Sequence, residues 1–534
     1  MSPTSTVFYG TFIDLPRTKS SDKHVLSIRH GAIWVSADGT IEGVDFTVAN
    51  DRDLRTLIRR KGWTVRNDTH TSSLKSKSQA KVHLIRAEAS QNEFFFPGFI
   101  DTHIHASQYP NAGLFGSSTL LDWLKTYTFP METSLGNPSI PSLPPASAFR
   151  VYNQTITRTL SHGTTYAAYF ATIHVPATQL LASLCLQRGQ KALIGRVCMD
   201  NPTFCPETYR DASAEATVTQ NEDVIAHIRA IDPAGTLVKP IITPRFAPTC
   251  TAAAMRGLAD QAVRHASADG APLHIQTHIS ENRSEVDTVR EFFPEQRDYA
   301  SVYDACGLLT PRTILAHGVH LTAAEHELIR ARGSKIAHCP ASNSALGSGL
   351  CPVRRILDAG VTVGLGTDVS GGYSASVLEA VRQACLVSRL VRFAEEVEVG
   401  VAEEERARMV VSVEEALYLA TRGGAMVVDA ADEVGGFEVG MRFDAQLVRL
   451  GAAVGKRGAR EESPVDVFGW ESWHEKVHKW VWNGDDRNVK AVWVNGRLVH
   501  SRGDVGEVGG RLLRWVLGLG VVGVGALVAW RYRR

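Results

Sequence analysis

The sequence has no marked excess of either charge and no paired cysteines. Its 57 Lys and Arg residues against 56 Asp and Glu exclude the strongly basic surface that binding to a nucleic-acid backbone needs. The eight cysteines are scattered, and no CxxC occurs that could hold zinc or carry out redox chemistry. Residues 1–12 also lack the basic and apolar regions of a secretory signal. We therefore predict a protein of a reducing, intracellular compartment that does not bind nucleic acid.

One long uncharged run lies near the C-terminal end. Residues 515–530 carry no charge, begin and end with Trp, and are flanked on both sides by Arg. Aromatic ends and basic flanks are typical of a membrane-spanning helix, although the run is close to the short limit of about 17 residues. We expect residues 511–534 to contact an intracellular membrane as an anchor. The alternative is a terminal helix that packs on the rest of the chain or lies on a surface.

Short apolar runs alternate with amphipathic stretches from about residue 94 to residue 368. The eight runs are FFFPGFIDTHIH, TTYAAYFA, ALIGRVCMD, LVKPIITPRF, PLHIQTHIS, TILAHGV, SKIAHCP and VTVGLGTD. Strands that alternate with helices indicate βαβ units and a parallel sheet. An open doubly wound sheet would usually carry a Gly-rich loop after its first strand, and none occurs here. We therefore predict an α/β fold, a (β/α)8 barrel of the TIM type.

The remaining residues predict a smaller β-sandwich built from both ends of the chain. VFYGTF, HVLSIRHGAIWV and KVHLIRAEA lie before the barrel, and FDAQLVRL and VKAVWVNGRLVH lie after it. We expect the first part of the sandwich at 1–96, the barrel at 97–430, the second part at 431–504 and the apolar tail at 505–534. The polar stretches at 67–80 and 451–464 are predicted to be surface loops.

Two histidines stand at the end of the first predicted barrel strand. His103 and His105 are two residues apart, so their side chains leave the same face of the strand. His278 and Asp368 end later strands, and the ends of barrel strands are where reactive residues gather. Three imidazoles and a carboxylate suit one zinc ion and leave a position for water. For the HxH pair by itself, the alternative is two histidines packed in a core.

One further residue, Glu281, is expected to transfer protons. Glu281 follows His278 by three residues and could take a proton from a water whose pKa zinc lowers to about 7. Asp368 can share this task. The alternative for Glu281 is an acid in the first turn of a helix, where the helix dipole favours it. His317, which ends another strand, either contacts the metal or bonds its water, and both remain open.

Five motifs resemble the amidohydrolase superfamily: PGFIDTHIHASQY, THISENRSEV, LAHG, AHCPASNSAL and GLGTDVSGGYS. Together with LLDWLKTYTFPMET and GGFEVGMRFDA, they are similar to the guanine deaminase family within it. The resemblance extends from about residue 97 to 444 and resumes at 484–489. It implies a barrel with an attached β-sandwich, one zinc per chain, a homodimer in the cytosol, and hydrolysis of guanine to xanthine and ammonia.

The resemblance also assigns roles to residues of this sequence. It implies metal ligands at His103, His105, His278, His317 and Asp368, and catalytic roles for Glu281, His317 and Asp368. It implies substrate contacts at His105, Ala106, Ser107, Gln108, Arg245, Phe246, His278, Glu281 and Asp368. Arg and amide donors suit the oxo group and ring nitrogens of a purine, and an aromatic face can stack on it. The sequence departs from the family at Ala341, where Asn is frequent.

The metal ligands do not separate guanine from other substrates. A deaminase or chlorohydrolase of the same superfamily that acts on a triazine, cytosine or an adenosine-type nucleoside would share them. The zinc deaminases with H-x-E and PCxxC motifs are excluded because neither motif occurs. A non-catalytic scaffold held at a membrane by its tail is a further alternative, which the presence of Glu281 disfavours.

Overall fold

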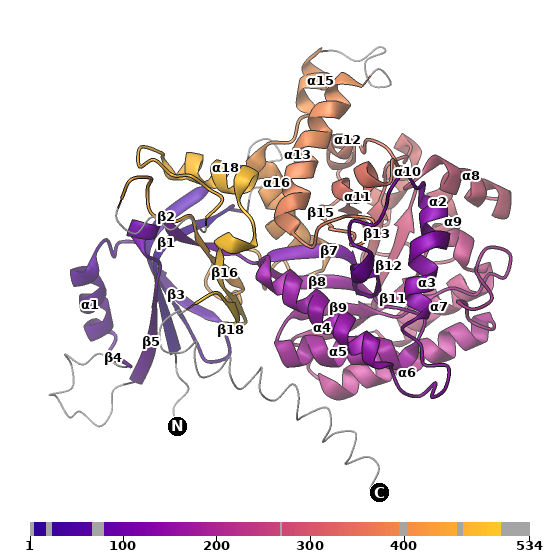
Figure 1. Cartoon of the computed structure of the whole chain (residues 1–534), viewed down its shortest axis with the longest axis horizontal. Coiled ribbons are helices and arrows are strands. Elements are labelled where there is room, and N and C mark those ends of the chain that lie inside the picture. Colours follow the sequence, from indigo (N-terminus) through magenta and orange to yellow (C-terminus); the bar gives the residue numbers. More distant parts are fainter. Residues whose placement is uncertain are drawn as a thin grey trace, which may run out of the picture. The chain divides into compact units, whose positions relative to one another are not determined.

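The computed structural model describes residues 5–17, 24–66, 80–266, 270–394, 403–456 and 463–503. The predicted polar loops lie at least partly outside these ranges, and the predicted tail at 505–534 lies wholly outside them. Within the described ranges, no helix is both long enough and apolar enough to cross a membrane. The chain forms two compact units, and one of them comprises Phe99–Gly435 with a short segment that begins at Leu15 (Figure 1).

The larger unit is built around parallel strands that follow one another around a barrel. In the described residues, the hydrogen-bonded order is β7, β8, β9, β11, β12, β13, β14 and β15. Their bounds are Phe99–His105, Thr164–Phe170, Lys191–Gly195, Val238–Pro244, His274–Ile279, Thr313–His317, Lys335–His338 and Val363–Leu365, and a two-residue strand, β10 (Val197–Cys198), also pairs with β11. This order confirms the predicted barrel.

The first predicted run contains two strands that belong to different sheets. β6 (Glu93–Pro97) lies in the sheet of the smaller unit, and β7 begins the barrel two residues later. Pro97 has no backbone N–H with which to continue a ladder, which accounts for the break. The barrel is then joined end to end, because Asp368 N donates to His103 O at 2.8 Å and His105 N donates to Val369 O at 2.9 Å.

Helices connect the barrel strands and continue after the last of them, β15 (Figure 1). They are α2 (Leu120–Trp123), α3 (Phe129–Thr133), α4 (Ala146–Ser161), α5 (Val175–Arg188), α6 (Ala214–Ile231), α7 (Ala252–Arg264), α8 (Arg283–Phe292), α9 (Tyr299–Ala305), α10 (Ala323–Ala331), α11 (Pro340–Ala345), α12 (Val353–Asp358), α13 (Val377–Phe393), α15 (Glu403–Arg408), α16 (Val413–Tyr418) and α17 (Gly424–Val427). Gly189 caps the C-terminal end of α5, has φ 78° and donates its N–H to Cys185 O at 2.9 Å. A side chain would strain this left-handed cap, so glycine marks the helix end.

The barrel interior contains both apolar and polar side chains. A buried apolar cluster includes Ile100, Leu193, Ile241, Ile314 and Ala337, together with Val427 of α17. At the start of the strands, His274 and Lys335 bond the Asp429 carboxylate at 2.9 and 2.5 Å. The opposite ends of the strands carry the predicted site.

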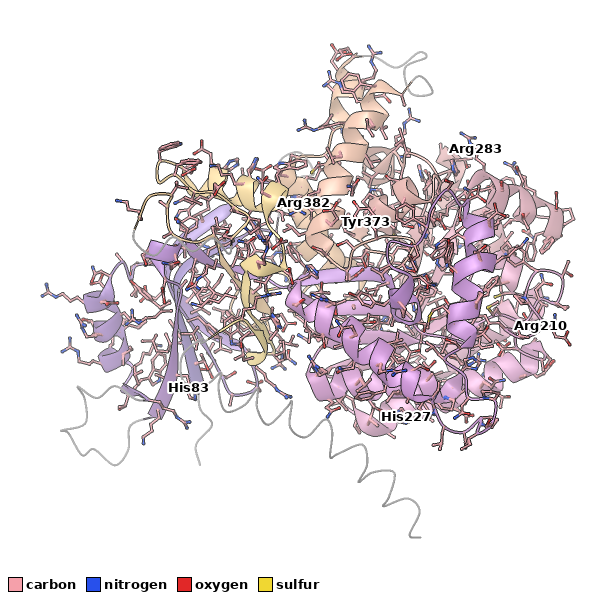
Figure 2. The ribbon with its side chains drawn as sticks, in the orientation of Figure 1. His83, Arg210, His227, Arg283, Tyr373 and Arg382 are labelled. Carbon is pink, nitrogen blue, oxygen red and sulfur yellow. The ribbon has the colours of Figure 1, made fainter. Side chains whose placement is uncertain are left out.

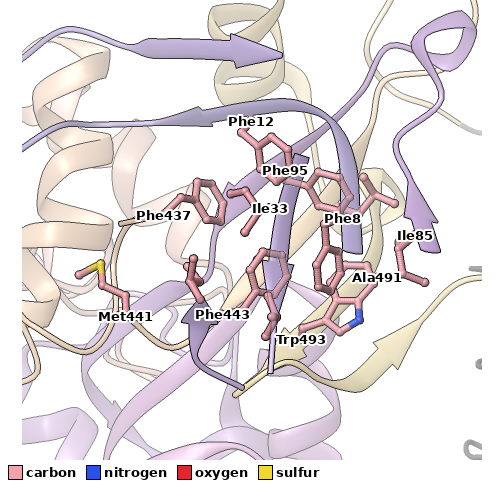
Figure 3. Close-up of a cluster of buried hydrophobic side chains, with 14 residues drawn as sticks. Phe8, Phe12, Ile33, Ile85, Phe95, Phe437, Met441, Phe443, Ala491 and Trp493 are labelled. Carbon is pink, nitrogen blue, oxygen red and sulfur yellow. The ribbon is translucent and has the colours of Figure 1, made fainter. Parts of the chain in front are cut away.

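The smaller unit contains one sheet built from both ends of the chain. Its strands are β1 (Ser5–Asp14), β2 (Ser27–Val35), β3 (Ile41–Asp45), β4 (Trp63–Val65), β5 (Ala80–Arg86), β6, β16 (Ala445–Arg449), β17 (Val489–Val494) and β18 (Arg497–Ser501), with helices α1 (Asp51–Arg60) and α18 (Trp473–Asn483). β1 pairs with β2, β5 and β6, so the sheet branches there. An aromatic core covers its face, in which Phe8 stacks on Phe443 with ring centroids 3.9 Å apart (Figure 3).

Candidate metal centre and active site

Four of the predicted ligands meet at the C-terminal ends of the barrel strands. His103, His105, His278 and Asp368 are all buried, and one ligand atom of each lies within 4.8 Å of the others. The backbone bonds between β7 and the segment after β15 set His103 and His105 beside Asp368. β12 contributes His278, whose Nε2 lies 3.1 Å from that of His105. Residues distant in sequence therefore form one cluster.

The chemistry of this cluster fits a metal ion. His278 Nδ1 donates to Arg245 O at 2.6 Å, which leaves a lone pair on Nε2 facing the Nε2 atom of His105. Burial lowers the pKa of both imidazoles well below the ordinary value, so both are neutral. Two lone pairs at this distance repel unless a cation or proton lies between them. A neutral imidazole is also the form that binds a metal.

The Asp368 carboxylate supplies the negative charge of the cluster. Its Oδ1 lies 3.0 Å from His103 Nε2 and 3.4 Å from His105 Nε2. Burial alone would raise the pKa of this carboxyl, but the neighbouring His103 and His317 lower it well below its usual range. Asp368 is therefore ionised, as a metal ligand must be.

His317 lies beside the cluster and faces Glu281. Its Nδ1 donates to Asn343 Oδ1 at 2.9 Å, so Nε2 is the atom that faces the site. That Nε2 is 3.5 Å from Glu281 Oε2 and 3.8 Å from Asp368 Oδ2. Burial would lower the pKa of His317, but the nearby Glu281 carboxylate raises it above the ordinary value. The amide that orients His317 comes from Asn343, two residues after the departure at Ala341.

Glu281 precedes a helix and is not part of it. α8 begins at Arg283, an exposed residue labelled at the edge of the barrel unit in Figure 2. Its N-cap is Asn282, and the acid in its first turn is Glu285, whose Oε2 accepts from Glu281 N at 2.8 Å. The alternative assignment of Glu281 to a helical first turn is therefore wrong. Glu285 occupies the first turn of α8, and its carboxylate fixes the backbone N–H of Glu281 by a hydrogen bond.

The Glu281 carboxyl is buried in the wall of the pocket. Its side chain accepts a hydrogen bond from Ser348 Oγ at 3.0 Å. Burial raises the pKa of this carboxyl to about 7, and the neighbouring Asp368 charge adds to the rise. A carboxyl that titrates near neutral pH can both take and return a proton.

A cavity opens beside these groups. It is lined by His105, Gln108, Leu120, Trp123, Leu124, Arg245, Phe246, His278, Glu281, Glu285, Leu346 and Asp368. Gln108, Arg245 and Phe246 thus reach the pocket, whereas Ala106 and Ser107 are not among these lining residues. Ser107 instead bonds Ala171 O at 2.7 Å and Tyr152 Oη at 3.0 Å. The structure therefore gives no contact to the pocket for these two predicted substrate residues.

Several residues of this site were not predicted from the sequence. Trp123, Leu124 and Glu285 line the pocket, and Glu132 bonds Gln108 and Arg245 from behind it. The signal was that Trp123, Leu124 and Glu132 fall within LLDWLKTYTFPMET, and Glu285 within THISENRSEV, both of which contributed to the resemblance. The first of these stretches forms α2, a π-helical turn at Leu124–Thr128 and α3, a sequence of short elements with no single period.

Comparison with known proteins gives matches over most of the chain. A model of the amidohydrolase family matches residues 94–499. A probable guanine deaminase of Schizosaccharomyces pombe is 46% identical over 430 residues, which cover 80% of this chain and 76% of that protein. The guanine deaminase of Homo sapiens is 40% identical over 417 residues, with 77% and 84% covered. The structure of a guanine deaminase from C. acetobutylicum with guanine in its active site has a TM-score of 0.72 at 29% identity and covers 93% of this chain and 100% of that one.

Proposed function

The chain belongs to the amidohydrolase family and, within it, to the guanine deaminases, and we propose on this basis that it hydrolyses guanine to xanthine and ammonia. One observation carries the proposal for this chain. A single cavity joins a buried His and Asp cluster and Glu281 to the donor groups of Gln108 and Arg245. A hydrolytic centre and a means of recognising a purine therefore share one pocket.

His103, His105, His278 and Asp368 would hold one metal ion, and the donor set favours zinc. Imidazoles with one carboxylate suit zinc and leave a position open. When bound, the metal supplies a Lewis acid that lowers the pKa of a water to about 7. His317, with Nε2 between Glu281 and Asp368, would bond the attacking water or add a further ligand.

Glu281 would move the protons of the reaction. Its carboxylate accepts a proton from the water that adds at C2 of guanine. It passes this proton to the ring nitrogen beside C2, takes the second proton from the hydroxyl group now on C2, and gives that one to the departing amino group, which leaves as ammonia. Asp368 and His317, which flank the same space, stabilise the charge that develops during these proton transfers.

Arg245, Gln108 and Phe246 would orient the purine. Arg245 and Gln108 carry N–H donors that match the 6-oxo group and ring-nitrogen acceptors of guanine. The Phe246 ring, which lines the pocket, offers an apolar contact for the base. Adenine has an amino group at C6 and none at C2, so this arrangement disfavours it.

The organisation of the protein in the cell remains a prediction. We propose a cytoplasmic homodimer whose residues 511–534 contact an intracellular membrane. These tail residues lie outside the described part of the chain.

A substrate panel tests the proposed function. Purified protein is incubated separately with guanine, cytosine and a triazine, and ammonia release is measured. Release from guanine at a rate well above that from the other two is expected. Faster turnover of cytosine or the triazine would show that the chain acts on another heterocycle. No ammonia release from any of the three would favour the non-catalytic scaffold.

A further inference from the structure

Glu132 on α3 is fully buried behind the pocket and bonds two residues of its wall. Its Oε1 accepts from Gln108 Nε2 at 2.7 Å and from Arg245 Nη2 at 3.2 Å, and its Oε2 accepts from Arg245 Nη1 at 2.8 Å. Glu132 is not among the residues that line the cavity. It therefore acts on a ligand only through Gln108 and Arg245.

The carboxylate determines which atoms Arg245 presents to a ligand. Both terminal nitrogens of the guanidinium are engaged by Glu132, which fixes the plane of the fork. The remaining N–H groups are all donors, because a guanidinium has no acceptor. Glu132 also neutralises a cation that is only 2% exposed and lies next to a metal site.

The same carboxylate determines the orientation of the Gln108 amide. Because Gln108 Nε2 donates to Glu132, its Oε1 is turned toward the N–H of Ser370, at 3.4 Å. The second N–H of the amide is then the group left for a ligand. With the amide reversed, two oxygens would face one another at Glu132, and Gln108 would offer an acceptor in place of a donor.

Glu132 is itself fixed by the neighbouring barrel segment. Tyr209 Oη donates to Glu132 Oε2, and burial raises the pKa of this phenol well above its ordinary value, so it remains a donor. Tyr209 Oη also accepts from Ile173 N at 3.2 Å and pairs with Thr172 Oγ1 at 2.9 Å. The carboxylate is thus tied to the loop after β8, and it holds Arg245 and Gln108 rigidly.

We infer that Glu132 is a positioning residue that sets specificity for 6-oxo purines by holding Arg245 and Gln108 as a pair of donors aimed at the oxo group. This inference rests on the proposed function. A ligand that carries the 6-oxo group benefits from the donor pair, and one that lacks it leaves two buried donors without an acceptor.

The variant Glu132→Gln separates this role from a merely structural one. Gln has the same shape, but its amide nitrogen would face donor groups of Arg245, Gln108 or Tyr209. Binding of hypoxanthine, which has the 6-oxo group, and of purine, which lacks it, is measured by calorimetry on the metal-loaded protein. We expect the wild type to prefer hypoxanthine, and the variant to lose about 10-fold or more of that preference. Its kcat/KM for guanine should fall about 100-fold with the metal content unchanged.

Two further variants complete the test. Glu325→Gln changes another buried carboxylate, one that caps α10, and should leave the ligand preference as in the wild type. If Glu132→Gln does not fold, Tyr209→Phe retains the carboxylate, removes one of its bonds, and should reduce the preference to a smaller extent. An unchanged ratio of hypoxanthine to purine affinity in the folded variant would overturn the inference. A wild type that binds hypoxanthine but releases no ammonia from guanine would instead overturn the proposed function.

Discussion

Three residues at the mouth of the barrel have a left-handed backbone without being glycine. Ser280, His317 and Asp368 have φ values of 48°, 76° and 48° and stand just after or at the ends of their strands. Such conformations are costly for residues with a Cβ and are retained where the surrounding structure enforces them, often at functional sites. Here they turn His317 and Asp368 toward the site and bring Glu281 back to it.

Glu281→Gln should leave the metal bound and reduce guanine turnover by about 10²-fold to 10⁴-fold or more. The amide keeps the shape and the bond from Ser348 but cannot take a proton. Metal content by elemental analysis and kcat for guanine test this expectation. Glu291→Gln, on the exposed face of α8, is the matched control and should behave as the wild type. Near-normal turnover in Glu281→Gln would show that Glu281 does not transfer the protons of the reaction.

The residues at the strand ends were predictable from the sequence, and their supporting partners were not. The two-residue spacing of His103 and His105 indicates a metal site, and Asp368 is indicated by its place after an apolar run. Glu132 and Asn343 act through bonds to residues 113 and 26 positions away in sequence. No local pattern encodes such contacts, because they depend on how the barrel brings its loops together.

At the level of elements, the predicted runs located the strands well and their boundaries less well. FFFPGFIDTHIH reads as one strand because Pro97 and Gly98 interrupt it without lowering its apolar character. α8 begins later than the acidic residues suggest, because Asn282 caps it and Glu285 closes the capping box. In the first case the missing N–H of Pro97 sets the boundary, and in the second the capping box of α8 does.

Asp429→Asn should destabilise the larger unit at neutral pH. Asp429 has φ 52° and bonds His274 and Lys335 at the start of β12 and β14. Asn tolerates this backbone but lacks the charge, and a loss of about 2 kcal/mol is expected for hydrogen bonds to a charged group. The temperature of thermal unfolding measures the effect. Asp432→Asn, which removes an exposed ion pair with Arg17, is the control and should change little.

The pH dependence of this difference gives a second readout of the same variant. Burial raises the pKa of Asp429, but the bonds from His274 and Lys335 outweigh it and lower the pKa below its ordinary value. The carboxylate therefore stabilises the protein above about pH 4, and this contribution is lost as the pH falls through the lowered pKa. The difference in unfolding temperature between the wild type and Asp429→Asn should become smaller at acid pH. A difference that is constant down to pH 3 would contradict the assigned bonds.

For the molecule as a whole, removal of the metal should lower the unfolding temperature of the larger unit. The ion would bind a site that exists only in the folded barrel, and a metal at 1,000 times its Kd stabilises by about 4 kcal/mol. Calorimetry before and after treatment with a chelator, and again after addition of Zn²⁺, tests this. An unfolding temperature that the chelator does not change would argue against metal in the cluster.

A chain that ends at residue 503 should retain guanine turnover and lose membrane association. All helices and strands of the described residues lie before that point, and the apolar run at 515–530 follows it. Fractionation of cells that express each chain, with the activity measured in every fraction, compares the two. Equal distribution of the full and shortened chains would rule out an anchor.

The barrel was predictable because the chain repeats one local pattern eight times, an apolar run alternating with an amphipathic stretch. The smaller unit was predictable as β structure from both ends, since VFYGTF and VKAVWVNGRLVH alternate as strands do. Its branching at β1 was not, because β1 pairs with strands that follow it by very different distances in sequence. Pairing between distant segments is decided by packing of the aromatic core and not by local propensity.

The most direct test of the central claim is the stoichiometry of products from guanine. Metal-loaded protein is incubated with guanine or adenine, and the purine product and ammonia are quantified together. One xanthine and one ammonia are expected for each guanine consumed, with adenine turned over more slowly by about 10⁴-fold or more. Comparable rates on adenine, or consumption of guanine without equal amounts of xanthine and ammonia, would contradict that claim.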